Sequence, residues 1–234
     1  MKNKSALVAS VLFCLGGIES AAAHEVGFYI GGFVLQSSKD APRGEFEALN
    51  SAVQEFSFFT VGEQRNSFDE SDTGFALSGG YRFTRYIAIE GGFTRFGQVT
   101  FKSRATGNFP LEPGTLATNI ESETSGFTLS VLGAWPVTRN WDLFARAGAL
   151  IANNELKLVV VAEGDQFVPP LGPGFSESGS KSSTDYFASL GISRRVLEIY
   201  AVRLEYQRVF DAGVELTGGE SDLDAIVLGL VVTF

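Results

Sequence analysis

The feature that most constrains this chain is a set of eight segments in which apolar residues alternate with small or polar ones. Each segment spans about 9–13 residues, which is the length of a tilted strand that crosses a bilayer. The segments cover roughly residues 26–36, 74–84, 86–99, 125–137, 141–153 (with a continuation toward 162), 184–194, 198–210 and 223–234. A period of two is that of a β-strand whose two faces meet different surroundings. The pattern therefore predicts an all-β, antiparallel fold.

The connections between these segments alternate strictly between long and short. The long ones are residues 37–73, 100–124, 154–183 and 211–222. The short ones lie at 84–85, 138–140 and 195–197. In a membrane barrel, tight turns occupy the periplasmic rim and long loops face outside, whereas a sandwich mixes loop lengths at both ends. We therefore predict an eight-stranded antiparallel up-and-down transmembrane β-barrel, with a secreted β-sandwich as the alternative fold.

Charge is expected on only one face of each strand, because the other face would touch hydrocarbon. In the last strand the predicted lipid face carries Ile226, Leu228, Leu230, Val232 and Phe234. In strand 141–153 it carries Leu143, Ala145, Ala147, Ala149 and Ile151, and in strand 198–210 it carries Val202, Leu204 and Tyr206. Aromatic residues near the strand ends are expected to form interfacial girdles; they are Tyr86, Trp135, Trp141, Tyr200 and Tyr206.

The first 23 residues are typical of a secretory signal peptide. Lys2 and Lys4 precede an apolar run of about a dozen residues, which is shorter than the ~20 that a spanning helix needs, and Ala21-Ala22-Ala23 offers a cleavage site. We predict a signal peptide over 1–23, a barrel domain over 24–234 and residence in the outer membrane. The single cysteine lies inside the signal, so disulfides, thiol catalysis and cysteine metal sites are not expected.

The predicted mature chain is acidic and offers few groups for chemistry. The full chain has 18 Lys+Arg and 27 Asp+Glu; removing Lys2, Lys4 and Glu19 leaves 16 − 26 = −10, which disfavours nucleic-acid binding. Its one histidine, His24, would be terminal, so no general base and no catalytic site are predicted. The acidic stretches 69–72, 121–123 and 222–224 lack EF-hand spacing, and the glycine pairs lack a phosphate-loop context. Neither a metal nor a cofactor is predicted.

Three fragments in order resemble the OmpA transmembrane barrel, with the OmpX-like proteins beside it. They are Gly79-Gly80-Tyr81-Arg82-Phe83 followed by Glu90-Gly91-Gly92-Phe93, then the stretch 141–148, then Arg203-Leu204-Glu205-Tyr206-Gln207. The final Phe234, preceded by alternating apolar residues, matches the signal that barrel assembly machinery reads. The resemblance implies a monomeric barrel among outer-membrane lipids and lipopolysaccharide, without the peptidoglycan-binding domain of larger members.

The resemblance also implies a cluster of charge in the lumen, formed by Glu90, Arg146, Arg203 and Glu205. In the family such a cluster is proposed to gate a narrow water path. Two inward positions depart from the family pattern: Leu132 stands where a lysine is expected, and Ser193 where a glutamate is expected. An eight-stranded lumen is just wide enough for side chains, so opposite charges are also expected there for simple compensation. We favour compensation over gating.

The pattern and the resemblance together favour a structural role in envelope integrity, with long, exposed and mobile surface loops that could serve adhesion. Binding functions concentrate on such loops, although nothing in the sequence identifies a loop ligand. Two alternatives from other classes are a narrow, low-conductance diffusion channel and a lipid A-modifying enzyme.

Overall fold

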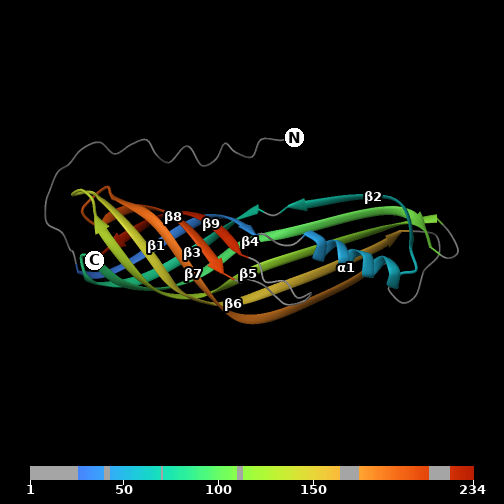
Figure 1. The fold of residues 1–234 in the computed structure, drawn as a ribbon, viewed down its shortest axis with the longest axis horizontal. Helices are drawn as coiled ribbons and strands as arrows, with labels where there is room; N and C mark the ends of the chain where they lie inside the picture. Colours follow the sequence, from blue (N-terminus) through green and yellow to red (C-terminus); the bar gives the residue numbers. More distant parts are fainter. Residues whose placement is uncertain (1–25, 40–42, 70, 110–112, 164–173, 211–221) are drawn as a thin grey trace.

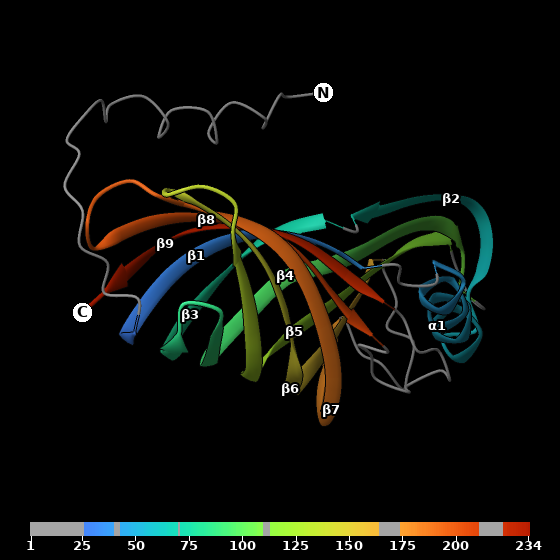
Figure 2. The ribbon, with the colours of Figure 1, turned by 60° about the vertical axis from the view of Figure 1, so that its left-hand side comes forward.

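Eight strands close into a ring in the part of the chain that the computed structural model describes, which is residues 26–39, 43–69, 71–109, 113–163, 174–210 and 222–234. They are β1 (Gly27–Lys39), β3 (Ser71–Thr84), β4 (Ile87–Asn108), β5 (Pro113–Pro136), β6 (Trp141–Glu163), β7 (Gly174–Arg195), β8 (Tyr200–Phe210) and β9 (Leu223–Thr233). Every neighbouring pair is antiparallel, β9 pairs with β1, and β4 pairs with β5 to close the ring (Figures 1 and 2). The predicted barrel fold is confirmed.

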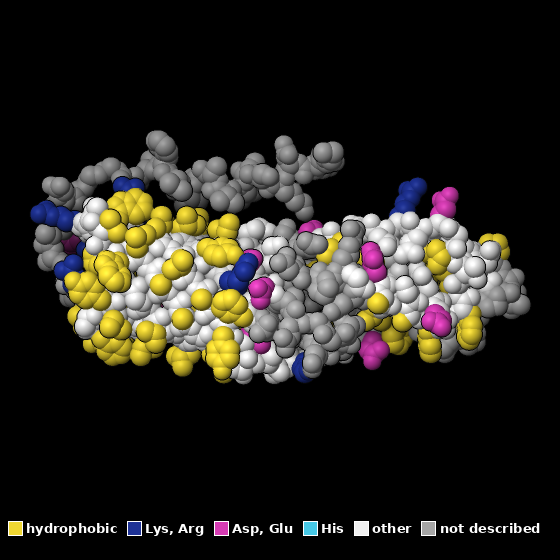
Figure 3. All heavy atoms as spheres, in the orientation of Figure 1, with side chains coloured by type: hydrophobic (Ala, Val, Ile, Leu, Met, Phe, Trp, Pro, Cys, Tyr) yellow, Lys and Arg dark blue, Asp and Glu magenta, His cyan; other side chains and the backbone are white. Residues whose placement is uncertain are grey.

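The outer wall of the ring is an apolar belt, as the alternating pattern predicts. The predicted lipid-facing residues of β6, β8 and β9 all point outward, and Leu204 and Leu230 are 43% and 45% exposed. Apolar side chains gather over the barrel half of the molecule, whereas charged side chains stand mainly at its end and over the opposite half (Figure 3). Such a belt is suited to hydrocarbon rather than to water.

The prediction that charge occupies only one face of each strand is wrong at the edge of this belt that lies farther from the short turns. Arg208 on β8 and Asp224 on β9 both lie on the outward face. Arg208 Nε donates to Asp224 Oδ1 at 2.7 Å, and the hydroxyl of Tyr206 donates to the same oxygen at 2.7 Å. Paired charges beside an aromatic ring belong at the water-facing edge of a membrane, where lipid headgroups begin.

Beyond this edge, β4 to β7 continue as a curved sheet that we call the extension. The predicted loops 37–73, 100–124 and 154–183 are therefore wrong as loops over their described residues. Residues 40–42, 70, 110–112 and 164–173 of these loops, and almost all of loop 211–222, lie outside the described residues. The first of them holds helix α1 (Arg43–Phe56) and strand β2 (Thr60–Asp69), and β2 pairs with the upper part of β4. Figures 1 and 2 show α1 lying against the extension, far from the C-terminus.

The extension has a hydrophobic core separate from that of the barrel. Phe46 of α1 packs against Phe68 of β2 and Phe101 of β4, with ring centroids 5.3 and 6.1 Å away. A second group lies farther out and includes Phe59, Phe109, Leu116 and Val160, with Val53 of α1 beside it. The helix thus covers the inner face of the extension. Among the described residues, no helix has the length and apolar character needed to cross a membrane.

Candidate functional site in the barrel lumen

Four charged side chains from three strands meet inside the barrel and form what we call the charged ring. They are Glu90 on β4, Arg146 on β6, and Arg203 and Glu205 on β8. Glu90 shares the lumen face of its strand with Ala88, and the two residues of β8 lie two apart, so each side chain points to the same interior. The structure brings together all four residues that the resemblance implied.

Each arginine of the charged ring contacts both glutamates. Arg203 Nη1 donates to Glu90 Oε1 at 2.6 Å, and its Nη2 lies 3.3 Å from both Glu90 Oε2 and Glu205 Oε2. Arg146 Nη1 lies 3.1 Å from Glu90 Oε2, and its Nη2 lies 2.5 Å from Glu205 Oε1. The ring is closed and electrically neutral, and Glu90 and Arg203 are only 1% and 4% exposed.

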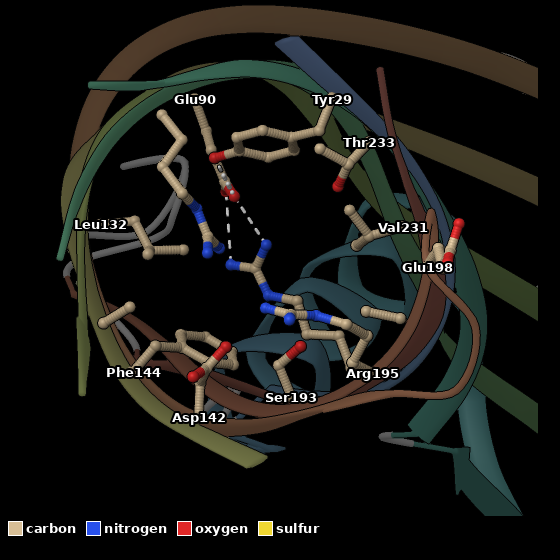
Figure 4. Close-up of a pocket in the computed structure, with 14 residues that line it drawn as sticks. Tyr29, Glu90, Leu132, Asp142, Phe144, Ser193, Arg195, Glu198, Val231 and Thr233 are labelled. Atoms are coloured by element: carbon tan, nitrogen blue, oxygen red, sulfur yellow. Dashed lines mark hydrogen bonds and ion pairs between the residues drawn. The ribbon is translucent and has the colours of Figure 1, made fainter. Parts of the chain in front are cut away.

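Two polar neighbours complete the charged ring. The Tyr29 hydroxyl donates to Glu90 Oε1 at 2.8 Å, and Arg146 Nη2 donates to Gln207 Oε1 at 3.0 Å. Figure 4 shows Tyr29 and Glu90 converging on the middle of the lumen from one wall. The Tyr29 ring has room because it lies over a glycine: a Cβ added at Gly80 would be 2.6 Å from Tyr29 Cζ. Sequence reasoning did not find Tyr29, although the period of two places it on the lumen face of β1.

Aromatic faces hold the two guanidinium groups. The Phe144 ring centroid lies 4.2 Å from Arg203 Cζ, and the Phe187 centroid lies 5.0 Å from Arg146 Cζ. Such cation–π contacts favour a desolvated cation. The Nε atoms of both arginines are buried without a partner among the described residues, so the compensation is nearly but not fully complete.

Layers of mixed apolar and polar side chains lie on both sides of the charged ring. Toward the extension the apolar members are Leu35, Phe96, Leu150, Phe187 and Val209, and the buried Thr128 and Asp185 lie beside Leu150. Toward the short turns the apolar members are Ala88, Leu132, Ala134, Phe144 and Val231, and Arg82, Asp142, Arg195 and Glu198 line the same space. Between the ring and the short turns there is a cavity of about 60 Å³, which has room for only a few water molecules (Figure 4).

The two departures from the family pattern also line this cavity. Leu132 is buried and points into the lumen from β5, and Ser193 points in from β7 (Figure 4). Neither side chain can exchange an ion pair with Glu90 or with the arginines. The charged ring therefore has no alternative charged partner at these two positions.

Acidic residues elsewhere are mostly engaged in local contacts. Glu121 accepts from Gln98 and Asn119, and Glu123 pairs with Arg95 at 2.6 Å. Within the described ranges, no group of three or more His, Cys, Asp or Glu side chains could hold a metal ion. His24 lies outside the described residues.

Comparison with known families places the chain among the OmpA-like transmembrane domains. The model of the OmpA-like transmembrane domain family matches residues 24–234. Outer membrane protein P5 of Haemophilus influenzae is 28% identical over 210 residues, which cover 88% of this chain and 50% of that protein, so the chain spans about half of this relative's length. Neisserial surface protein A gives a TM-score of 0.48 at 13% identity, covering 89% of this chain and 97% of that one. Ail of Yersinia pestis gives 0.45 at 15% identity with the same coverages.

Proposed function

Because the chain belongs to the family of OmpA-like transmembrane domains, we propose that it is a closed barrel that strengthens the outer membrane and holds a folded recognition surface outside the cell. Export would follow cleavage after Ala23, and insertion would use the barrel assembly machinery with Phe234 as the signal. The barrel would work as a monomer among lipids and lipopolysaccharide. This proposal joins the envelope and adhesion roles, with the extension in place of mobile loops.

The observation that carries the proposal is the way the lumen is filled. A neutral ring of buried charge crosses the lumen with bulky apolar side chains on both sides of it, and each arginine is already held by both glutamates. A conducting path would need hydrated, mobile charge along its length, and gating would need a second partner for the arginines. Leu132 and Ser193 supply none, and the carboxylates of Asp142 and Glu198, which line the cavity on the side of the short turns, make no ion pair with either arginine in the described chain. The filled lumen supports a scaffold over a diffusion channel.

The fold also supports a scaffold over an enzyme. A lipid A-modifying barrel would need a nucleophile beside a general base at the outer rim. The chain's one histidine is placed by sequence at the predicted mature N-terminus, on the periplasmic side. Two of the described carboxylates near the outer rim, Asp224 and Glu123, are paired with arginines.

Single-channel recording tests the closed barrel. The refolded mature protein is inserted into a planar bilayer beside an Arg203→Ala variant, and heat-modifiable mobility shows that both are folded. We expect no discrete conductance steps from the natural sequence. Steps that change in size in the variant would make the charged ring a constriction and would favour the narrow channel.

The recognition role is tested by trimming the extension. Residues 40–70, 98–123 and 155–183 are each replaced by a short turn, which leaves the ring of eight strands. Cells that display the trimmed barrel should attach less well to host-cell monolayers than cells that display the full chain at equal surface amounts. Equal attachment would remove the recognition role and leave only the structural one.

A further inference from the structure

The convex outer face of the extension carries a band of positive charge at one level. Arg65 of β2 lies directly opposite Arg104 of β4 in the antiparallel register, and both side chains point outward. Lys102 lies on the same face, two residues closer to the membrane. Like charges directly opposite one another destabilise a strand pair. These three cations would be relieved by an anion placed among them.

Acidic residues bound this band on both sides. The next outward row away from the membrane holds Glu63 and Glu163, and the next row toward the membrane holds Asp69 and Glu121, with Lys157 opposite Glu121. The positive charge is therefore a local island in a chain whose formal net charge is −9. An island of this kind favours an anion at one place and disfavours unspecific binding of polyanions along the whole surface.

The cations in the band are available to a ligand. Arg65 and Lys102 have no hydrogen-bond or ion-pair partner among the described residues. Arg104 Nη2 lies 3.2 Å from Glu163 Oε2, but both side chains are about two-thirds exposed, and an exposed pair of this kind contributes little. A ligand carrying several negative groups could engage all three cations at small cost.

The band borders an open groove of about 420 Å³. Ala117, Val159 and Val161 give the groove an apolar floor from β5 and β6. Asn119 also lines the floor; its amide Nδ2 donates to Glu121 at 2.8 Å, while its Oδ1 is buried without a partner in the described chain. A buried acceptor without a donor costs free energy, and turning the Asn119 side chain toward the groove would let a ligand hydroxyl donate to it.

We propose that this groove binds an anionic saccharide that carries phosphate or sulfate groups. The cations would hold the anionic groups, the apolar floor would contact the C–H face of a sugar ring, and Asn119 Oδ1 would accept from a hydroxyl. The proposal rests on the proposed function in one respect, namely that the extension stands outside the membrane. Arg95 pairs with Glu123 near the outer rim of the barrel, and Lys102 lies seven residues farther along β4. The groove would therefore stand about 20–25 Å beyond the rim.

Two sources of this chemistry lie outside the cell. The groove opens sideways from the extension, so the phosphorylated core of lipopolysaccharide in the same membrane can reach it. A sulfated glycan of another cell is the second source. Both would use the same cations, and the choice of probe separates them.

The test is calorimetric titration of the mature protein in nanodiscs made without lipopolysaccharide. The probes are a phosphorylated core oligosaccharide freed from lipid A, a heparin-derived oligosaccharide, and an uncharged dextran fragment. At least one charged probe should bind, the dextran should not, and R65S/K102S should weaken binding about 100-fold, or about tenfold per cation. The tighter charged probe identifies the source.

The matched control is Lys157→Ser, because Lys157 is an exposed, outward-facing lysine of the same sheet outside the groove. It should change the affinity less than about twofold. Failure of both charged probes to bind, or an equal loss in Lys157→Ser and Lys102→Ser single variants, would overturn the proposal. Neither result would alter the conductance of the barrel. The proposal of a saccharide site and the proposal of a closed barrel can therefore be contradicted independently.

Discussion

At the scale of single residues, the charged ring depends on balance more than on any one bond. Glu90 and Glu205 each meet both Arg146 and Arg203, so every charge has two partners of opposite sign. Taking a charge out of water costs several kcal/mol, and only complete pairing offsets that cost. Removing one member therefore leaves a buried charge that the other three cannot neutralise.

The first prediction is a double-mutant cycle on the pair Glu90 and Arg203. The single variants Glu90→Gln and Arg203→Met should each lower the free energy of unfolding by about 3–5 kcal/mol, because each leaves one buried charge unpaired. The double variant retains the balanced pair Arg146 and Glu205 and should cost less than the sum, with a coupling of about 0.5–3 kcal/mol. Urea unfolding in lipid vesicles, followed by tryptophan fluorescence, measures all three. Purely additive losses would show that compensation does not govern the ring.

At the scale of strands, the lipid face decides whether an element can insert. Leu204 lies at the middle of the outward face of β8, between Val202 and Tyr206. Leu230 lies on β9, opposite Val202 of β8. Both contact hydrocarbon in the proposed orientation. The inward neighbours of Leu204 are Arg203 and Glu205, so a shift of one residue in register would place two charges in lipid.

The second prediction follows from this geometry. Leu204→Arg or Leu230→Arg should each destabilise the inserted barrel by about 2–4 kcal/mol, because arginine would face the middle of the membrane. The yield of the heat-modifiable folded form measures the effect. Ser178→Arg is the control, since Ser178 is exposed on the part of β7 that belongs to the extension. Normal folding of both leucine variants would mean that the assigned faces are inverted.

The barrel strands could be predicted from the sequence because the membrane fixes both their period and their length. The extension could not be predicted in the same way, since water sets no such length. Alternation does continue through Val99, Phe101, Ser103 and Ala105, but the residues between them are Thr100, Lys102 and Arg104, which favoured a loop interpretation over a lipid-facing strand. Helix α1 had a signal in Phe46, Leu49 and Val53, spaced three and four apart, which a search for strands overlooks.

The candidate site was predictable to the same degree as its strands. The resemblance gave the four charges of the ring, and the period of two puts Gln207 on the face opposite Val202, Leu204 and Tyr206. Tyr29 and the aromatic supports Phe144 and Phe187 depend on which strands face one another across the lumen. Which strands face one another is set when the ring closes, and the sequence of a single strand does not show it. The groove on the extension was invisible for the same reason, since Arg65 and Arg104 meet only through the pairing of β2 with β4.

At the scale of the whole molecule, one set of strands serves two environments. β4 to β7 run from the barrel into the extension without a break, yet their cores are separate. Helix α1 and strand β2 belong to the extension alone: β2 pairs with β4 only from Thr100 outward. The barrel keeps all its own strand pairs when α1 and β2 are detached. The extension should therefore open locally while the barrel stays folded.

The last prediction tests that division with two phenylalanines of one helix. Phe46 is 8% exposed and packs on Phe68 and Phe101, whereas Phe56 is 59% exposed. Phe46→Ser should cost the extension about 3–5 kcal/mol, as large-to-small core changes do, and should open residues 43–69 to protease. Heat-modifiable mobility of the barrel should be unchanged, and Phe56→Ser should resist protease like the natural sequence. Limited proteolysis with mass spectrometry shows both results. Loss of the folded barrel in Phe46→Ser would mean that extension and barrel form one cooperative unit, so that a ligand in the groove would also stabilise the membrane-spanning strands.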